Sequence, residues 1–146
     1  MKRRGQAKRK DGQLSALAHV LVVEDDPVLG MATEDTLRDA GVARVDICPT
    51  TDGALEILRT TKPDALILDV HLSDRSDGWA IAELVETLGE NSPRIVFSTG
   101  APQEIPAEVA ELGSVLEKPY APEALLAALQ DTGRRGLLTR LRGALG

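Results

Sequence analysis

The amino-acid sequence predicts an α/β fold, in which a doubly wound, five-stranded parallel sheet forms the middle layer of a three-layer sandwich. Short apolar runs alternate five times with segments of helical pattern, and the connections between them are short. This alternation favours parallel strands joined by right-handed helical crossovers on both faces of one sheet. The third run, residues 65–68, leads directly into Asp69. Asp69 is then expected at the carboxyl edge of the sheet, where open sheets of this kind place their chemistry.

Residues 19–41 are predicted to form a strand followed by a helix. Residues 19–23 are almost wholly apolar, which suits a strand buried on both faces. Pro27 is favoured in the first turn of a helix, and Asp26 is a plausible N-cap. One narrow inward face is expected, made of Leu29, Thr33, Thr36, Leu37 and Ala40. Gly41 is predicted to end this helix.

Residues 44–69 are predicted to repeat the pattern. Residues 44–48 form a short second strand, and Thr51 or Asp52 caps the helix that follows. The apolar residues of that helix are Ala54, Leu55, Ile57 and Leu58. The third strand, residues 65–69, would be about 17 Å long at roughly 3.3 Å per residue, enough to cross a small domain.

Residues 73–130 complete the predicted set of elements. A polar loop over residues 73–78 leads to a third helix with an inward face of Ala80, Ile81, Leu84 and Leu88. A fourth strand is expected at residues 94–98, followed by a short helix at 106–112 that is bounded by prolines. A brief fifth strand at 115–117 and a final helix at 122–129 follow.

Composition limits the class of protein. The chain has 146 residues, enough for one domain with a sizeable core, and Cys48 is its only cysteine. No disulfide can form within the chain, which favours a reducing compartment and hence the cytoplasm. No apolar run reaches about 18 residues, so no membrane span is expected.

Charge divides the chain into three segments. Residues 1–11 hold six Lys or Arg and one Asp, and residues 131–146 hold four Arg and one Asp. The remaining residues hold seven bases against 21 acids. We therefore expect a folded domain over residues 17–131, between a flexible basic tail at 1–16 and a basic tail at 132–146. An acidic body argues against nucleic-acid binding by the domain itself.

The predicted topology gathers polar residues from separate strands at one edge. Glu24, Asp25, Asp69, Thr99 and Lys118 all fall at or just beyond the carboxyl ends of predicted strands. Two like charges about 4 Å apart repel by about 4 kcal/mol at an effective dielectric near 20, so three facing carboxylates call for a cation. Oxygen ligands suit Mg²⁺ or Mn²⁺. With a hydroxyl and an ammonium beside them, they predict a site for a phosphoryl group on Asp69.

Each of these residues could also have a purely structural role. The acids Glu24 and Asp25 could simply stabilise a helix N-terminus. Thr99 with Gly100 could be a turn, and Lys118 could belong to a loop. Their joint occurrence at one edge in this order is much harder to obtain by chance.

Four segments resemble the receiver domain of two-component response regulators: 22–27 (VVEDDP), 66–69 (LILD), 98–100 (STG) and 117–120 (EKPY). The resemblance covers about residues 17–130. It implies a flavodoxin-like fold and an Asp69 that accepts a phosphoryl group from a histidine kinase or a histidine phosphotransfer protein. It implies a signalling protein rather than an enzyme.

The resemblance also implies a role for each site residue. Asp25 and Asp69 would bind Mg²⁺ directly, and Glu24 would act mainly through water. The backbone carbonyl of His71 would complete the protein ligands. The phosphoryl group would be contacted by Thr99 through a hydrogen bond and by Lys118 through its charge.

Within receivers, residues 97–100 (FSTG) with 118–120 (KPY) resemble the single-domain FAT GUY subfamily, although Ser98 stands where that motif has Ala. Many receivers carry an aromatic residue at the position of Val115, so a rotating aromatic cannot be carried over. Only 26 residues follow Tyr120, so no output domain is expected. The signal is then expected to leave through Gly100, Val115 and Tyr120, by protein contact or phosphorelay, from a monomer or weak dimer.

Two other functions stay open at this point. An Asp-nucleophile phosphohydrolase typically needs a second Asp two residues after the nucleophile as general acid, and that position is His71. A nucleic-acid-binding regulator would use the basic tails, and its binding would depend on salt. An imidazole role of His71, as phosphohistidine or metal ligand, lacks a second His or Cys nearby in the sequence.

Overall fold

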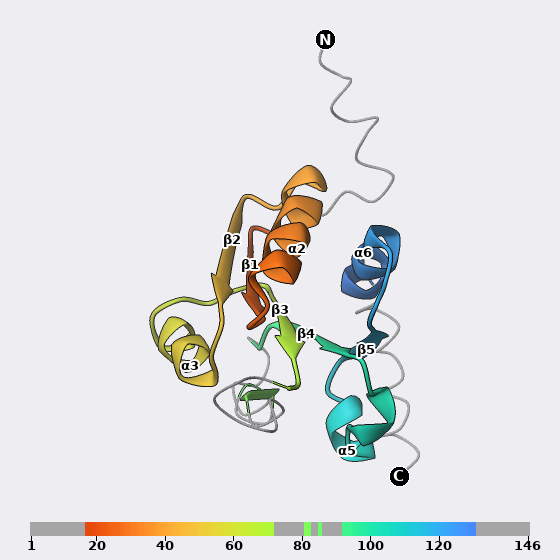
Figure 1. Ribbon diagram of the computed structural model, residues 1–146. Helices are drawn as coiled ribbons and strands as arrows, with labels where there is room; N and C mark the ends of the chain where they lie inside the picture. Colours follow the sequence, from red (N-terminus) through yellow and green to blue (C-terminus); the bar gives the residue numbers. More distant parts are fainter. Residues whose placement is uncertain (1–16, 72–80, 83–84, 86–91, 131–146) are drawn as a thin grey trace, which may run out of the picture.

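The computed structural model describes residues 17–71, 81–82, 85 and 92–130. Figure 1 shows their arrangement. The strands are β1 (His19–Val23), β2 (Arg44–Cys48), β3 (Ala65–Asp69), β4 (Arg94–Thr99) and β5 (Ser114–Glu117). The helices are α2 (Pro27–Asp39), α3 (Thr51–Thr60), the 3₁₀ helix η2 (Pro102–Glu104), α5 (Ala107–Ala110) and α6 (Pro122–Gln130). The two basic tails and most of the predicted third helix lie outside the described residues.

All five strands are parallel and form one sheet in the order β2-β1-β3-β4-β5. The central strand β3 lies between β1 and β4, and every residue of β1 and β3 is buried. Burial on both faces explains why these strands read as unbroken apolar runs. The predicted α/β fold with five parallel strands is confirmed.

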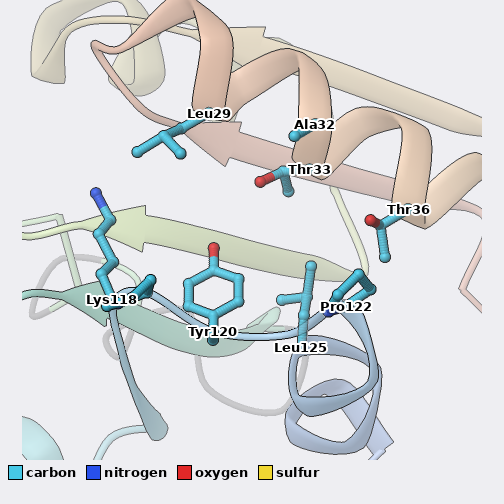
Figure 2. A pocket seen from close by; sticks show the side chains of 9 residues that line it. Leu29, Ala32, Thr33, Thr36, Lys118, Tyr120, Pro122 and Leu125 are labelled. Atoms are coloured by element: carbon cyan, nitrogen blue, oxygen red, sulfur yellow. The ribbon is translucent and has the colours of Figure 1, made fainter.

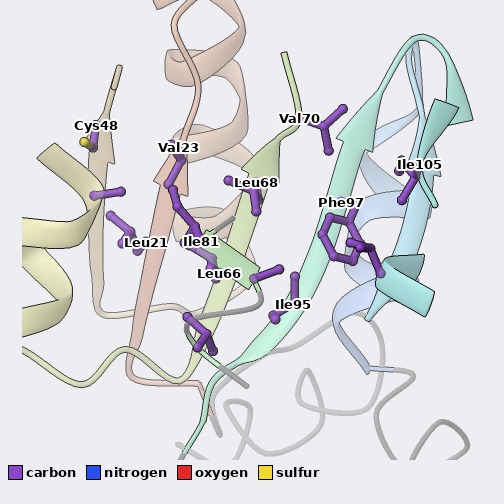
Figure 3. Close-up of a cluster of buried hydrophobic side chains, with 14 residues drawn as sticks. Leu21, Val23, Cys48, Leu66, Leu68, Val70, Ile81, Ile95, Phe97 and Ile105 are labelled. Atoms are coloured by element: carbon purple, nitrogen blue, oxygen red, sulfur yellow. The ribbon is translucent and has the colours of Figure 1, made fainter. Parts of the chain in front are cut away.

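Alternate residues of each strand point to opposite faces of the sheet, so the core has two halves. Leu21 and Val23 face the side of α3 and α5, whereas Val20 and Val22 face the side of α2 and α6. Figure 3 shows the first half, in which Phe97 is fully buried between Leu68 and Ile105. The described part of the third helical segment contributes to the same half, through Ile81, Ala82 and Val85.

Capping residues fix where the helices begin and end. Asp26 accepts hydrogen bonds from the N–H groups of Val28 and Leu29, and Gly41 has a φ of 107° just after α2. The cap of α3 is Thr50, not Thr51 or Asp52. Thr50 has the extended backbone of a cap, and its hydroxyl accepts from Gly53 N at 3.0 Å.

The inward face of α2 includes Gly30 in place of the predicted Leu29. Gly30, Thr33 and Leu37 are buried, whereas Leu29 is 41% exposed. Gly30 lies close to β2, and a Cβ atom there would lie 3.2 Å from Ile47 Cγ2. The absence of a side chain therefore lets α2 approach the sheet, and it turns Leu29 outward.

The segment after β4 contains two short helices rather than one. η2 comes first, and α5 has only four residues. Pro106 separates them in an extended conformation, with φ −56° and ψ 144°. A residue with this backbone cannot continue a helix, so Pro106 separates η2 from α5, and α5 begins at Ala107.

The amino edge of the sheet is tied to both ends of the described domain. Asp64 Oδ2 accepts from the N–H groups of Ala18 and His19, at 2.8 and 2.9 Å. At the other end of the domain, Arg94 donates from Nη1 to the carbonyl oxygen of Leu129 at 3.2 Å. Within the described ranges, no helix has the length and apolar character needed to cross a membrane.

Gly113→Ala is expected to destabilise the domain by about 2–3 kcal/mol, as overpacking of a tight site does. A Cβ atom at this position would lie 2.2 Å from the carbonyl oxygen of Ile95, so β4 or the turn before β5 must shift. The measurement is urea unfolding followed by circular dichroism. Gly100→Ala is the matched control, since nothing lies within 4 Å of its Cβ position. Equal unfolding midpoints for the two variants would contradict this packing.

Candidate phosphorylation and metal site

Three acids meet at the carboxyl edge of the sheet. Glu24 directly follows β1, and Asp69 ends β3. Carboxylate oxygens of Glu24, Asp25 and Asp69 all lie within 4.8 Å of one another. Glu24 is only 7% exposed and Asp69 only 5%, while Asp25 is the most exposed of the three. The sequence predicted this convergence from topology alone.

Lys118 supplies a positive charge to this cluster. Its Nζ lies 3.1 Å from Glu24 Oε1 and 3.5 Å from Asp69 Oδ2. Its backbone N–H donates to the carbonyl oxygen of Thr99 at 2.8 Å, which fixes the loop after β5 to the end of β4. The Lys118 side chain therefore reaches the acids from a fixed position.

Burial and charge together shift two pKa values at the site. Burial raises the pKa of Glu24, the hydrogen bond from Lys118 opposes this, and the charge of Asp69 adds to it, so the net shift is upward. Burial lowers the pKa of Lys118, but the hydrogen bond to Glu24 and the charge of Asp69 more than offset it. The pKa of Lys118 is raised overall, so it stays an ammonium group at neutral pH.

Backbone N–H groups hold the two buried carboxylates. His71 N donates to Asp69 Oδ1 at 3.0 Å, and Asp26 N donates to Glu24 Oε2 at 3.2 Å. The two Asp69 oxygens thus have different surroundings, because Oδ1 accepts from the backbone and Oδ2 lies near Lys118. A nucleophilic carboxylate fixed in this way needs little reorganisation before it reacts.

The donor set fits a hard divalent cation. Three carboxylates lie beside a single ammonium group, so the site has excess negative charge that a cation can neutralise. Oxygen donors with room for water are what Mg²⁺ and Mn²⁺ prefer. The loop at His71 adjoins Asp69, since His71 N donates to its carboxylate. Among the described residues, the cluster contains no imidazole.

The His71 side chain lies toward a different element. Its Nε2 is 3.1 Å from Glu104 Oε1, and both side chains are about half exposed. This contact links the loop after β3 to η2. It directs the imidazole to η2, and only the backbone of His71 adjoins the carboxylates.

Thr99 is buried at the end of β4. Its Oγ1 accepts a hydrogen bond from Ala101 N at 2.9 Å, which leaves the hydroxyl proton for another acceptor. Gly100, which follows it, is exposed. Thr99 thus offers a neutral donor at the same edge as Asp69.

The residues expected to carry the signal lie on two faces of the sheet. Val115 pairs with Phe97 and is 39% exposed, so it stands on the side of α5. Tyr120 packs instead against the core half of α2 and α6. The role of these residues in carrying the signal stays a prediction.

Sequence reasoning missed a groove beside the site. It has a volume of about 360 Å³ and lies between α2 and the loop that leads into α6. Its lining includes Leu29, Thr33, Thr36, Lys118, Tyr120 and Leu125. Figure 2 shows the Tyr120 ring pointing across the groove toward α2, with Lys118 at one end.

The sequence does signal an exposed apolar surface on α2 outside this groove. Val28 and Met31 are apolar, but helical spacing puts neither of them on the face of Thr33 and Leu37, and neither lines the groove. Val28 and Met31 are in fact 73% and 63% exposed. An outward apolar surface next to the site follows from that spacing.

Comparisons with known proteins agree with this geometry. The family model of the response regulator receiver domain matches residues 20–130. Response regulator MprA of Mycobacterium ulcerans is 32% identical over 120 residues, which are 80% of this chain and 50% of that protein. The chain thus spans about half the length of the curated relatives it matches.

Two solved structures extend the comparison. A CheY-like receiver domain from Methylobacillus flagellatus has a TM-score of 0.70 and 27% identity, and the match covers 79% of this chain and 98% of that one. The receiver domain of sensor histidine kinase PA1611 from Pseudomonas aeruginosa has a TM-score of 0.66 and 26% identity, over 77% and 94% of the two chains. That domain holds a magnesium ion in its active-site cleft.

The matching family model spans most of the chain, and the fold and acid cluster are those of its members. Phosphorylation on an aspartate is characteristic of this family. The chain therefore belongs to the response regulator receiver domain family of two-component systems.

Proposed function

We propose that this protein is a signalling receiver whose Asp69 accepts a phosphoryl group in a Mg²⁺- or Mn²⁺-dependent reaction. The observation that carries the proposal is the buried Asp69 carboxylate, which lies with Glu24 and Asp25 within 4.8 Å and has Lys118 Nζ at 3.5 Å. The donor would be a histidine kinase or a histidine phosphotransfer protein in the cytoplasm. The proposed folded unit is residues 17–131, flanked by basic segments 1–16 and 132–146.

Each residue has a defined part in the proposed transfer. An Asp69 oxygen attacks phosphorus, the bond from phosphorus to the donor nitrogen breaks, and its electron pair stays with the donor. When bound, a divalent cation would neutralise charge on the carboxylates and on the phosphoryl oxygens. Asp25, Asp69 and the His71 carbonyl oxygen would hold it, with Glu24 acting through water. Lys118 and the Thr99 hydroxyl would contact the new phosphoryl oxygens.

A signalling role is favoured over a phosphohydrolase. A general acid is needed two residues after such a nucleophile, and here that residue is His71. Its imidazole contacts Glu104 of η2, and only its backbone N–H contacts Asp69. We therefore propose no small-molecule substrate beyond the phosphodonor, and no nucleic-acid binding by the acidic domain.

The exposed apolar residues of α2 are proposed as the surface that the phosphodonor contacts. Val28, Leu29 and Met31 lie in the first turns of α2, next to the acid that follows β1. Exposed apolar side chains close to a reactive group are typical of a protein-binding surface. Of the three residues, Leu29 also lines the groove that extends to Tyr120 and Lys118.

The signal is proposed to leave through the loop after Thr99. Phosphorylation adds about −1.5 to −2 charge at Asp69, which draws the Thr99 hydroxyl toward it. Thr99 Oγ1 now accepts from Ala101 N, so movement of the hydroxyl disturbs the start of η2. α5 has four residues, too few to be stable without tertiary packing, so a local change can shift it. Gly100 and Val115 adjoin this route, and Tyr120 adjoins Lys118.

The FSTG and KPY motifs support assignment to the FAT GUY subfamily.

Asp69→Asn is expected to abolish labelling by a small-molecule phosphodonor such as acetyl phosphate in the presence of Mg²⁺. The amide lacks the nucleophilic oxygen that the reaction requires. Mass mapping of the acid-labile adduct, with and without a chelator, makes the measurement. Substantial labelling of the variant, or full labelling with chelator present, would refute the proposed function.

Met31→Glu is expected to slow phosphotransfer from the cognate kinase about tenfold or more, the effect of losing an interface hot spot. Labelling by acetyl phosphate should stay within about twofold, because Met31 is 63% exposed and outside the acid cluster. The kinase is first identified by profiling phosphotransfer from the host's histidine kinases. Val115→Glu, an exposed apolar residue on the opposite face, is the control and should transfer normally. Equal transfer rates in both variants would remove α2 from the proposed contact.

Amide hydrogen exchange with and without phosphorylation is expected to change most over residues 99–113. These residues include the Thr99 loop, η2 and α5. Both helices are short, so local opening of this segment costs little free energy. Unchanged exchange there, together with intact phosphoryl transfer to a second protein, would instead indicate a relay without a conformational switch.

A further inference from the structure

Ser98 carries a buried hydroxyl group beside the proposed phosphorylation site. The residue is 1% exposed, and no described residue forms a hydrogen bond with its Oγ. Buried hydroxyl groups almost always have a partner, because desolvating one without compensation costs free energy. The fold does not need this hydroxyl, since alanine would fill the strand position without the cost.

The register of the sheet places Ser98 next to Asp69. The two residues are direct partners in the parallel pairing of β3 and β4. Partners in register point to the same face of a sheet. Val96, two residues before Ser98, and Leu116, its partner on β5, both belong to the core half of α2 and α6. Ile67 places Asp69 on this same face by the same alternation.

The Asp69 carboxylate has a reason to accept a new hydrogen bond during the reaction. In this structure Oδ1 accepts from His71 N, and Oδ2 lies 3.5 Å from the ammonium of Lys118. A phosphoryl group on Asp69 would attract that ammonium away from the carboxylate. The oxygen left behind then needs a donor, and rotation of Ser98 about χ1 between staggered positions can supply one.

We propose that Ser98 is a positioning residue whose hydroxyl donates a hydrogen bond to the Asp69 carboxylate and so sets the lifetime of the phosphorylated state. The inference rests on the proposed function of Asp69. It assigns Ser98 no contact with the phosphoryl group itself, which is left to Lys118 and Thr99. The hydroxyl acts on the charge of the carboxylate.

The chemistry predicts different effects on the two directions of reaction. In hydrolysis the oxygen of a water molecule bonds to phosphorus, and the bond from phosphorus to the Asp69 oxygen breaks. The electron pair returns to the carboxylate, and the proton of the water leaves with the phosphate or to solvent. Negative charge grows on the carboxylate, so a hydrogen bond to it speeds hydrolysis. Before phosphorylation the Ser98 hydroxyl has no hydrogen-bond partner among the described residues, so it has little influence on the attack of Asp69 on the phosphodonor.

The test compares Ser98→Ala with wild type in three measurements. The hydrolysis rate of phosphorylated Asp69 is expected to fall roughly three- to tenfold, in line with the loss of one hydrogen bond to a charged group. Labelling by acetyl phosphate is expected to stay unchanged, because the Ser98 hydroxyl has no hydrogen bond to any described residue in the unphosphorylated state. The urea midpoint of the metal-free, unphosphorylated protein should stay the same or rise, because an unpartnered buried hydroxyl has been removed. Ser98→Thr keeps a hydroxyl and should restore the wild-type rates.

The outcomes separate this proposal from that for Asp69. If both rates are unchanged in Ser98→Ala, the hydroxyl only fills space and the inference is wrong. If both rates fall together, the substitution has distorted the site, and the inference is again wrong. If wild type takes up no label at Asp69 while the urea midpoint of Ser98→Ala rises, the proposed function of Asp69 is wrong. The role of Ser98 is then wrong too, because it depends on phosphorylation of Asp69.

Discussion

The charge balance between one ammonium and two buried carboxylates governs the carboxyl edge of this domain. Glu24 and Asp69 are almost fully buried, and their mutual repulsion would be costly without Lys118 Nζ between them. In this arrangement the Lys118 ammonium neutralises part of the carboxylate charge, as a bound metal ion would. In the proposed reaction, a divalent ion bound by the same acids would take over part of this neutralisation, and Lys118 would then be available to a phosphoryl group on Asp69.

The sheet provides the rigidity that this balance requires. Asp69 lies at the end of the central strand, with β1 on one side and β4 on the other, and the strands on both sides contribute site residues. The loops that complete the site are fixed by backbone hydrogen bonds, such as Lys118 N to the Thr99 carbonyl oxygen. The helices differ in this respect. α2 and α6 pack on one face, while the short η2 and α5 offer the other face an element that local charge can displace.

Much of the fold could be predicted because burial on both faces leaves a clear pattern. The bounds of β1, β2 and β3 match the predicted ones. β1 and β3 are apolar runs that end at or just before an acid, whereas β2 is an edge strand of mixed burial that is followed by Pro49. The convergence of Glu24, Asp25, Asp69 and Lys118 followed from topology. Finer details depended on backbone geometry that the pattern does not contain. Thr50, Thr51 and Asp52 are all competent caps, and only the extended backbone of Thr50 decides among them. A similar one-residue ambiguity affected α2, where Gly30 in place of Leu29 faces the sheet, close to Ile47 of β2.

The hydrogen bonds at the amino edge bring both ends of the described domain to one end of the sheet. Asp64 ties Ala18 and His19 to that edge, and Arg94 ties the end of α6 to it through Leu129. Both ends of the described domain therefore lie opposite the acids, about 17 Å away by the length of a five-residue strand. The acid cluster can thus be reached without passing the two points where the chain enters and leaves this domain.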